Sequence, residues 1–390
     1  MIPRLVKCSK TKSFFLFGGR AVGKSSYLQK QWSKLFKKDD IFWIDLLEPE
    51  KEREFNLRPF RLKEQILALK KKPKFIVIDE IQKAPKLLDV AHYLIQKKNM
   101  KFALTGSSLR KLKHGSANLL AGRAFLYKLF PLTFLELKDK FNLEQVLQFG
   151  SLPEIFKLGL KRDKIRYLNS YIHTYLKEEI VSEQVIRNIE PFRYFLEVAG
   201  QCNGSILNHS KVAREAGIDY KSCQRYFEIL EDTLLGFHLP AFSMSIRKQQ
   251  RQSPKFYLFD LGVARALAGL IDVNIQPATY SFGQCFEHLV IAEIYRLNEY
   301  LETNYKMSYF RSKDGLEIDL ILQKSHEKIL IEIKSKSKTV SDDLRHLKLI
   351  KKDMSSAKGF LLSLDKTARK ENGIFVFYWK DGLKRIFGLS

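Results

Sequence analysis

The sequence has few cysteines and no long apolar run. Its four cysteines, Cys8, Cys202, Cys223 and Cys285, lie far apart, with no CxxC pair and no histidine cluster at zinc-ligand spacing. This argues against a structural zinc site and predicts reduced thiols. No apolar stretch approaches the ~18 residues that a membrane span needs, and MIPRLVKCSK lacks the apolar core of a signal peptide. We therefore expect a soluble, cytoplasmic protein that does not enter a membrane.

Acidic residues are also scarce relative to basic ones. The chain has 43 Asp and Glu against 68 Lys and Arg, which gives a formal charge of +25 and a pI near 9.7. The excess is spread over the whole length, so a polyanion such as DNA is the natural partner, with a merely solvated basic surface as the alternative. At 390 residues the chain is too long for one comfortable core, which predicts two or three domains.

A glycine-rich loop follows the apolar segment SFFLF near the N-terminus. It has the pattern G-x-x-x-x-G-K-S at Gly18, Gly23, Lys24 and Ser25, between a predicted strand and a predicted helix. Such a loop turns backbone N–H groups toward phosphate oxygens, while the lysine reaches the β- and γ-phosphates and the serine ligates Mg²⁺. The alternative is a plain glycine-rich turn. The predicted nucleotide-binding residues are Gly18, Gly19, Arg20, Ala21, Val22, Gly23, Lys24, Ser25, Ser26 and Asp79.

Two acidic residues end the apolar run KFIVIDE at residues 74–80. A continuous run of this kind is typical of a parallel strand covered on both faces, and ligands of such sheets gather at the carboxyl ends of the strands. We expect Asp79 to hold Mg²⁺ and Glu80 to orient and deprotonate the attacking water, which predicts ATP hydrolysis as well as binding. The alternative is a pair of solvated acids.

Further apolar segments predict a parallel α/β sheet. Strands near 13–18, 40–46, 74–79 and 101–105 alternate with helical segments. The last of them, in KFALTGSS, ends at Thr105 and Ser107, where a polar side chain could sense the γ-phosphate. An ordinary turn is the alternative.

The motifs GGRAVGKSS, IDEIQKAPKLLDVAHYLI, FALTGSS and NLLAGRAFLYKLFPLTFLEL resemble the bacterial and archaeal AAA-type (AAA+) P-loop ATPases that carry a C-terminal domain of uncharacterised function. The resemblance covers nearly the whole chain. It implies an ATP- and Mg²⁺-dependent homo-oligomer, with a hexameric ring favoured. It also implies an arginine that completes the site of a neighbouring subunit. The candidate is Arg123 in LLAGRAF, with Arg110 as the second choice; an ordinary surface arginine is the alternative for both.

The middle of the chain predicts a helical lid and then a helix-turn-helix. Residues 127–190 are helical and polar, turning at Gly150 and Pro153. In ILNHSKVAREAGIDYKSCQRYFEIL, Asn208 or Ser210 caps one helix, Gly217 ends it and Asp219 caps a second. The predicted DNA-binding residues are Lys221, Gln224 and Arg225 on that helix, and Arg247, Lys248 and Arg251 at the tip of a wing between LGFHLPAF and PKFYLFD. A protein contact or a purely structural role are the alternatives.

Near the C-terminus, EIDLILQKSHEKILIEIKSK at residues 317–336 predicts a hairpin with charges in a suggestive order. Residues two apart in a strand share a face, so Glu332 and Lys334 point the same way while Ile331 and Ile333 point to the core. Asp319 on the preceding strand can reach the same side. Two carboxylates on Mg²⁺ or Mn²⁺, with a lysine to polarise water, form a phosphodiester-hydrolysis site. The alternative is an ordinary two-stranded hairpin whose charged residues lie on its solvent-exposed face.

This arrangement resembles the PD-(D/E)xK nuclease superfamily. The matching positions are Glu287, in a predicted amphipathic helix over 281–300, and then Asp319, Glu332 and Lys334, in the order of the superfamily. The resemblance implies metal ligation by Glu287, Asp319 and Glu332. The sequence departs from the pattern at Glu317, two residues before Asp319, because no proline precedes the aspartate. A fold that holds DNA without cutting it is the alternative.

The predicted architecture is an α/β P-loop NTPase core at 1–126, a helical lid at 127–190, a winged helix-turn-helix at 191–272 and a restriction-endonuclease-like α/β domain at 273–390. The leading hypothesis is an ATPase that binds, remodels or translocates DNA, branched DNA included, in repair, recombination or mobile-element defence. The alternatives are an ATP-controlled oligomeric switch with an inactive nuclease-like fold and a protein-remodelling ATPase.

Overall fold

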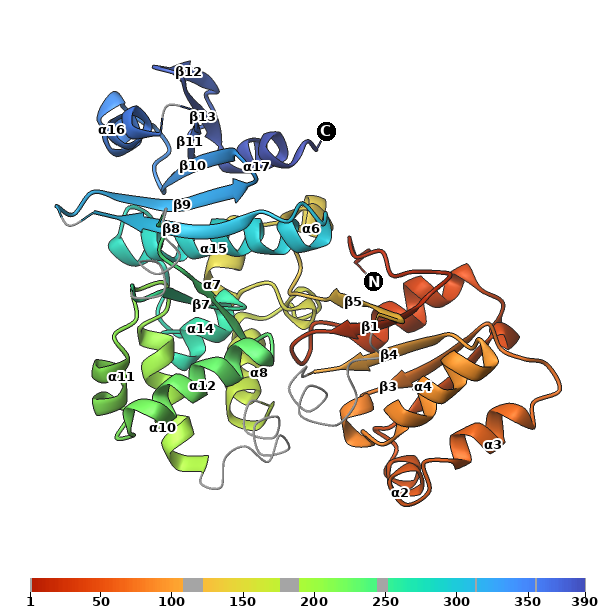
Figure 1. Cartoon of the computed structure of the whole chain (residues 1–390). Helices are drawn as coiled ribbons and strands as arrows, with labels where there is room; N and C mark the ends of the chain where they lie inside the picture. Colours follow the sequence, from red (N-terminus) through yellow and green to blue (C-terminus); the bar gives the residue numbers. More distant parts are fainter. Residues whose placement is uncertain are drawn as a thin grey trace.

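The computed structural model describes residues 2–107, 122–175, 189–243, 252–312, 314–354 and 356–389. The chain forms an N-terminal α/β module, a mainly helical middle module and a C-terminal module built on a second sheet (Figure 1).

The N-terminal module is a parallel sheet with helices around it. Within the described residues the strand order is β2-β3-β4-β1-β5, and every paired strand is parallel. The strands are β1 (Ser13–Phe17), β2 (Ile41–Asp45), β3 (Phe75–Asp79), β4 (Phe102–Gly106) and β5 (Ala124–Lys128). The helices are α1 (Lys24–Tyr27), α2 (Pro49–Leu57), α3 (Arg61–Leu67) and α4 (Leu87–Lys98), with a π-helical turn (Leu28–Trp32) after α1.

The four predicted strands of this sheet are confirmed to within about a residue at each end. The strands β1, β3 and β4 are buried along their whole length, because residues that are covered on both faces form continuous apolar runs. In contrast, β5 is an additional strand. It lies at the sheet edge with Phe125 and Leu126 exposed, so apolar patterning gives no signal for it.

The middle module contains the predicted pair of helices joined by a short turn. Asn208 accepts a hydrogen bond from the N–H of Lys211 and caps α11, and Asp219 accepts one from the N–H of Ser222 and caps α12. The helices are α6 (Phe134–Leu137), α7 (Leu143–Phe149), α8 (Lys161–Ser170), α10 (Ile189–Gln201), α11 (His209–Glu215), α12 (Tyr220–Asp232) and α14 (Leu261–Leu267). Two antiparallel strands follow α12, namely β6 (Gly236–Leu239) and β7 (Lys255–Leu258).

The C-terminal module has the strand order β12-β13-β11-β10-β9-β8 within the described residues. The strands are β8 (Lys306–Arg311), β9 (Glu317–Lys324), β10 (Glu327–Lys334), β11 (Lys358–Ser363), β12 (Arg369–Glu371) and β13 (Ile374–Tyr378). The helices are α15 (Tyr280–Tyr300), α16 (Arg345–Asp353) and α17 (Trp379–Phe387). Residues of α15 and α17 share one apolar cluster with the sheet, and residues of α16 share another, so the sheet is covered on both faces.

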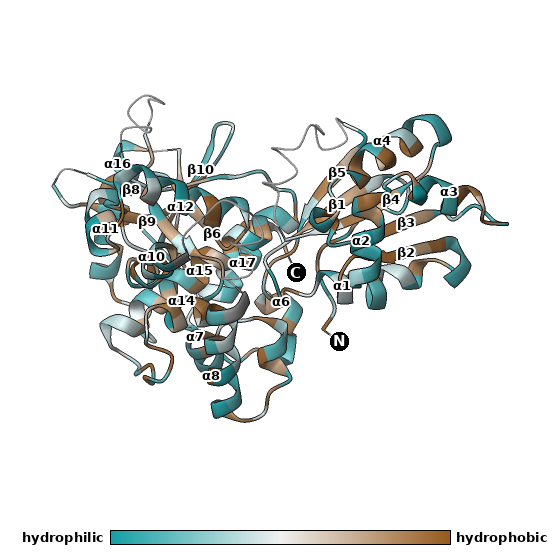
Figure 2. Cartoon of the chain, turned by 90° about the horizontal axis from the view of Figure 1, so that it is seen from below, coloured by the Kyte–Doolittle hydropathy of each residue, from teal (hydrophilic) through white to brown (hydrophobic). Residues whose placement is uncertain are grey.

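The modules share their cores rather than standing apart. One cluster joins Phe14 and Trp32 of the N-terminal module to Phe195 and Phe227 of the middle module. Figure 2 shows apolar strands inside the N-terminal module and hydrophilic surfaces on several outer helices. Across the part of the chain that the structure describes, no helix is both long and apolar enough to cross a membrane. The four cysteines are free thiols.

Candidate functional site

The phosphate loop connects the end of β1 to the start of α1. Gly23 has a φ of 95° and Ala21 a φ of 63°, both in the left-handed region. A Cβ on Gly18 would lie 2.3 Å from the carbonyl oxygen of Leu129, so only glycine fits there. The sequence thus folds locally into a tight loop whose backbone turns inward just before a helix begins.

The buried lysine of this loop is held by the loop itself. The Lys24 ammonium donates to the carbonyl oxygens of Gly18 at 2.9 Å and Gly19 at 3.4 Å. The nearest carboxylate oxygen, on Glu80, is 3.8 Å away. The lysine therefore pairs with an anion only at long range, and its charge is placed to receive a phosphate.

The acidic couple lies opposite this lysine, where β3 ends. The Thr105 hydroxyl donates to the carboxylate of Asp79 and accepts the backbone N–H of Glu80 at 2.9 Å. Thr105 is fully buried, so its hydroxyl is used to fix the acidic couple. Gln82 donates to Glu80, which has a φ of 59°.

Asp79 also interacts with the serine of the loop. Burial raises the pKa of Asp79 above its ordinary value, while hydrogen bonds from Ser25 and Thr105 oppose the shift. A hydroxyl and a carboxylate brought together at a phosphate loop are oxygen donors that fit Mg²⁺. The predicted donors Ser25 and Asp79 therefore meet, whereas Ser26 is exposed and Val22 is buried in the core.

Residues from outside the motif cover the loop. Tyr171 donates to the carbonyl oxygen of Arg20 at 3.1 Å, and a Cβ on Gly19 would touch Phe259 at 3.4 Å. The guanidinium of Arg4 donates to the Val22 carbonyl at 2.7 Å. No local pattern in the sequence predicts these contacts, because they form only when distant segments pack together.

The predicted trans-acting arginine lies near the edge strand. Arg123 directly precedes β5, is exposed, and has its Nη1 atom 2.7 Å from Nε2 of His92. The second candidate, Arg110, lies outside the described residues. The position of Arg123 on the surface leaves it accessible to another subunit, but its role stays a prediction.

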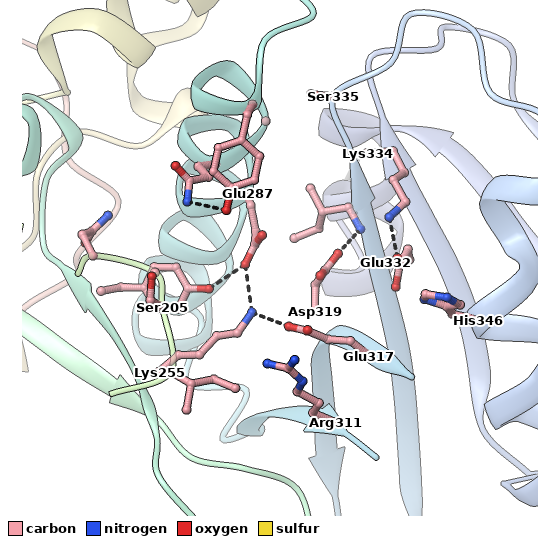
Figure 3. Close-up of a pocket in the computed structure, with 18 of the residues that line it drawn as sticks. Ser205, Lys255, Glu287, Arg311, Glu317, Asp319, Glu332, Lys334, Ser335 and His346 are labelled. Carbon is pink, nitrogen blue, oxygen red and sulfur yellow. Dashed lines mark hydrogen bonds and ion pairs between the residues drawn. The ribbon is translucent and has the colours of Figure 1, made fainter. Parts of the chain in front are cut away.

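The second candidate site is a groove of about 860 Å³ that is lined by α15, β7, β9 and β10 (Figure 3). Asp319 and Glu332 face each other there from the two strands of the predicted hairpin. The Asp319 carboxylate accepts the backbone N–H of Ile333 at 2.7 Å, and one oxygen of Glu332 pairs with the Lys334 ammonium at 2.7 Å. The structure therefore brings three of the four predicted C-terminal residues together.

These carboxylates are in an unfavourable environment. Glu332 is only 2% exposed, and its second oxygen, Oε2, has no hydrogen-bond partner among the described residues. Burial and then the neighbouring Glu332 carboxylate raise the pKa of Asp319 well above its ordinary range. Burial likewise raises the pKa of Glu332, although Lys334 opposes this shift. An unpartnered buried carboxylate oxygen beside a second carboxylate fits a divalent cation.

The fourth predicted residue, Glu287 on α15, has other partners. Its carboxylate accepts from the Tyr257 hydroxyl at 2.8 Å and pairs with the Lys255 ammonium at 3.3 Å. Lys255 also pairs with Glu317 at 2.8 Å. Among the described ranges, no three His, Cys, Asp or Glu side chains are grouped closely enough to hold a metal ion. The predicted trio is therefore not assembled in advance.

The predicted DNA contacts are only partly visible. Lys221, Gln224 and Arg225 are exposed on the first turns of α12. Arg247, Lys248 and Arg251 lie outside the described residues. The exposed face of α12 thus offers two cations and an amide, which is a chemistry suited to a phosphate backbone.

Comparison with known families agrees with this division of the chain. Residues 10–138 match the family described as AAA domain. Residues 140–274 and 282–381 match two families described as domains of unknown function, DUF8612 and DUF4143. Together with the parallel sheet and the phosphate loop, the first match defines the N-terminal module as a P-loop ATPase domain of the AAA type.

Curated relatives are of uncharacterized function. A protein of Mycobacterium tuberculosis is 27% identical over 279 residues, which is 71% of this chain and 62% of that protein. A protein of Methanocaldococcus jannaschii is 26% identical over 342 residues, covering 81% of this chain and 73% of the relative. The chain therefore spans less than two thirds of the mycobacterial protein.

Among solved structures, AMPPCP-bound DnaA from Aquifex aeolicus has 14% sequence identity and a TM-score of 0.28, covering 57% of this chain and 82% of DnaA. This score is too low to support an argument about the fold of this chain.

Proposed function

We propose that this chain is a cytoplasmic, Mg²⁺-dependent ATPase that acts on DNA, and that its C-terminal groove is a divalent-metal site for phosphodiester hydrolysis. The second part rests on the buried oxygen of Glu332 that has no partner within the described ranges and lies beside Asp319 and Lys334. In this proposal residues 1–126 form the ATPase core, 127–190 the lid, 191–272 a winged helix-turn-helix and 273–390 a restriction-endonuclease-like domain.

In the ATP site, each residue has a defined task. Lys24 would leave the carbonyls of its own loop to contact the β- and γ-phosphates, and Ser25 and Asp79 would hold Mg²⁺, which offsets phosphate charge when bound. Glu80 orients the attacking water and accepts its proton, while Thr105 keeps Glu80 in place. In a ring, with a hexamer favoured, Arg123 of one subunit stabilises charge in the site of the next.

In the groove, Asp319 and Glu332 would hold Mg²⁺ or Mn²⁺, which lowers the pKa of a bound water. Lys334 is placed beside Glu332 and is partly exposed, so its ammonium can contact a phosphate and stabilise the charge that develops on it. A water oxygen bonds to phosphorus, one P–O ester bond breaks, and the leaving oxygen takes up a proton. Lys221, Gln224 and Arg225 on α12, with Arg247, Lys248 and Arg251, would hold the DNA backbone.

Mn²⁺-dependent nicking of plasmid and branched DNA tests the groove. We expect cleavage by the full chain that Asp319→Asn and Glu332→Gln each reduce by about 100-fold or more, because both remove a metal ligand. Asp342→Asn, a change at an exposed acid, is the matched control and should cleave normally. Cleavage that persists in both groove variants would contradict the proposed site.

A second candidate function is a DNA-holding module without cleavage. It is favoured by the partners of Glu287, which pairs with Lys255 and Tyr257 and does not join the other two carboxylates. In that case the chain would bind DNA and divalent cation, and no nicking would occur with any metal. The same plasmid assay, combined with a binding measurement, separates the two.

A further inference from the structure

Lys255 is a charged residue of the C-terminal groove that the superfamily pattern does not include. It stands at the start of β7 in the middle module, yet its side chain reaches the groove and is only 6% exposed (Figure 3). Its ammonium lies 3.3 Å from an oxygen of Glu287 on α15 and 2.8 Å from one of Glu317 on β9. The groove is therefore built by two modules, and the middle module contributes a cation.

The position of this cation has a consequence for Glu287. Lys255 and Tyr257 bind the same carboxylate oxygen of Glu287, Oε1, from neighbouring positions of one strand. The carboxylate is thereby turned toward β7 and away from a shared position with Asp319 and Glu332. Glu332, in contrast, keeps one buried oxygen without a hydrogen-bond partner in the part of the chain that the structure describes. In the groove, Lys255 thus pairs with Glu287 and Glu317, whereas Lys334 pairs with only one oxygen of Glu332.

We propose that Lys255 is a built-in counter-ion of the groove, which occupies two of its carboxylates until a divalent cation binds. This inference rests on the proposed metal site. An ammonium and a metal ion repel each other at short range in a poorly solvated groove, so binding of the cation requires Lys255 to release Glu287. Lys255 is in this view a positioning residue that sets the affinity of the site for metal.

In the first test, the nucleotide-free full chain is titrated with Mn²⁺. Electron paramagnetic resonance measures the concentration of unbound Mn²⁺ at each step. The titration can reveal several classes of Mn²⁺-binding site that differ in affinity. The class that is lost in Asp319→Asn is assigned to the C-terminal groove. Lys255→Met, which keeps the length of the side chain and removes its charge, should tighten this class by about tenfold or more. Lys306→Met removes an exposed lysine from β8 of the same sheet and should change the affinity less than about twofold.

The second test uses the wild-type chain and stays valid if Lys255→Met does not fold. Reductive methylation of lysines, followed by mass spectrometry, measures how accessible each ammonium is. Addition of Mn²⁺ should increase modification of Lys255 several-fold, because the ammonium then releases Glu287. Modification of Lys306 should stay constant.

The outcomes separate the two proposals. Suppose that Lys255→Met folds and that the Mn²⁺ class that depends on Asp319 is present. If this class binds Mn²⁺ as in the wild type or more weakly, the role of Lys255 is overturned and the proposed metal site remains. Constant modification of Lys255 in chain saturated with Mn²⁺ does the same. If no Mn²⁺ class is lost in Asp319→Asn, both the metal site and the role of Lys255 fail.

Discussion

In the N-terminal module a buried lysine donates to two carbonyl oxygens, whereas in the C-terminal groove two buried carboxylates face each other and one of their oxygens has no partner among the described residues. The lysine is satisfied by its own loop, so the fold stands ready for a phosphate at little cost. The carboxylates are only partly satisfied, by the N–H of Ile333 and the ammonium of Lys334, so the groove favours the entry of a further cation. One site is prepared for an anion and the other for a cation.

The difference also concerns how each site is assembled. The phosphate loop is contiguous, and its acidic couple comes from a strand of the same sheet. The groove gathers side chains from α15, β7, β9 and β10, which span two modules. A contiguous site depends on local conformation, while a composite site depends on how the modules pack.

The largest expected effect is a loss of ATP binding when the buried lysine of the N-terminal module is removed. Lys24→Ala should weaken ATP binding by at least about 100-fold, because it removes the buried cation of the phosphate loop. Isothermal titration calorimetry with ATP and Mg²⁺ measures this. Lys30→Ala, at an exposed lysine a few residues further along, is the control and should bind ATP normally. Equal affinity of the two variants would remove Lys24 from the site.

Glu80→Gln should separate binding from chemistry. The change keeps the shape of the side chain but removes the base, so kcat should fall by about 100-fold or more while ATP still binds. Single-turnover hydrolysis of ATP measures the loss. Normal turnover would mean that another group deprotonates the water.

Arg4→Met tests whether the phosphate loop depends on distant segments. The buried guanidinium of Arg4 binds the Val22 carbonyl at 2.7 Å, Glu136 at 2.9 Å and the Tyr300 hydroxyl on α15 at 3.1 Å. Its removal leaves Glu136 buried without its cation, so unfolding free energy should fall by about 3–5 kcal/mol. Urea denaturation measures this, with exposed Lys7→Met as the control. A loss similar to that of the control would contradict the role of Arg4.

His288 lies on the helix that carries Glu287, and it should make the free energy of unfolding depend on pH. Burial lowers the pKa of His288 to about 3, and the neutral ring bonds to the Leu258 carbonyl at 2.7 Å. Because the pKa of His288 is lower in the folded chain than in the unfolded chain, the unfolded chain binds a proton first as pH falls. The folded state is therefore favoured fully above about pH 6.5 and loses stability below it. Between pH 7 and pH 5 this loss is about 2 kcal/mol.

His288→Gln should flatten that part of the stability profile, and thermal unfolding across this pH window measures it. The exposed His326→Gln is the control and should leave the slope unchanged. A variant at position 288 that keeps the wild-type slope would show that the acid sensitivity arises elsewhere.

The smallest expected effect concerns the surface of α12. Lys221→Gln should weaken DNA binding only a few-fold and reduce the slope of log affinity against log salt by about 1, because one phosphate contact is lost. Fluorescence anisotropy with a duplex at several salt concentrations measures both. An unchanged salt slope would place the DNA on another face.

The sequence predicted the parallel sheet of the N-terminal module and several helix starts, because these signals are local. The apolar runs before Gly18 and up to Asp79 gave the strands of the parallel sheet, and the caps Asn208 and Asp219 gave two helix starts. The edge strand β5 was not predicted, because its exposed residues do not form the continuous apolar run of a buried strand.

The sites were predicted to the extent that they follow motifs. The order of Asp319, Glu332 and Lys334 in a hairpin sufficed to place them in one groove. Lys255 and Arg4 could not be predicted, because each lies far in sequence from its partners and its role comes only from packing.

We propose that this chain couples a P-loop ATPase to DNA, and DNA-dependent ATP hydrolysis is the decisive experiment. Steady-state turnover of the full chain should be measured at moderate salt without DNA and with single-stranded, duplex and four-way DNA. The account predicts that at least one DNA raises the rate several-fold and that Lys24→Ala abolishes turnover in every condition. A rate that none of the three changes, together with no binding of any of them, would contradict it.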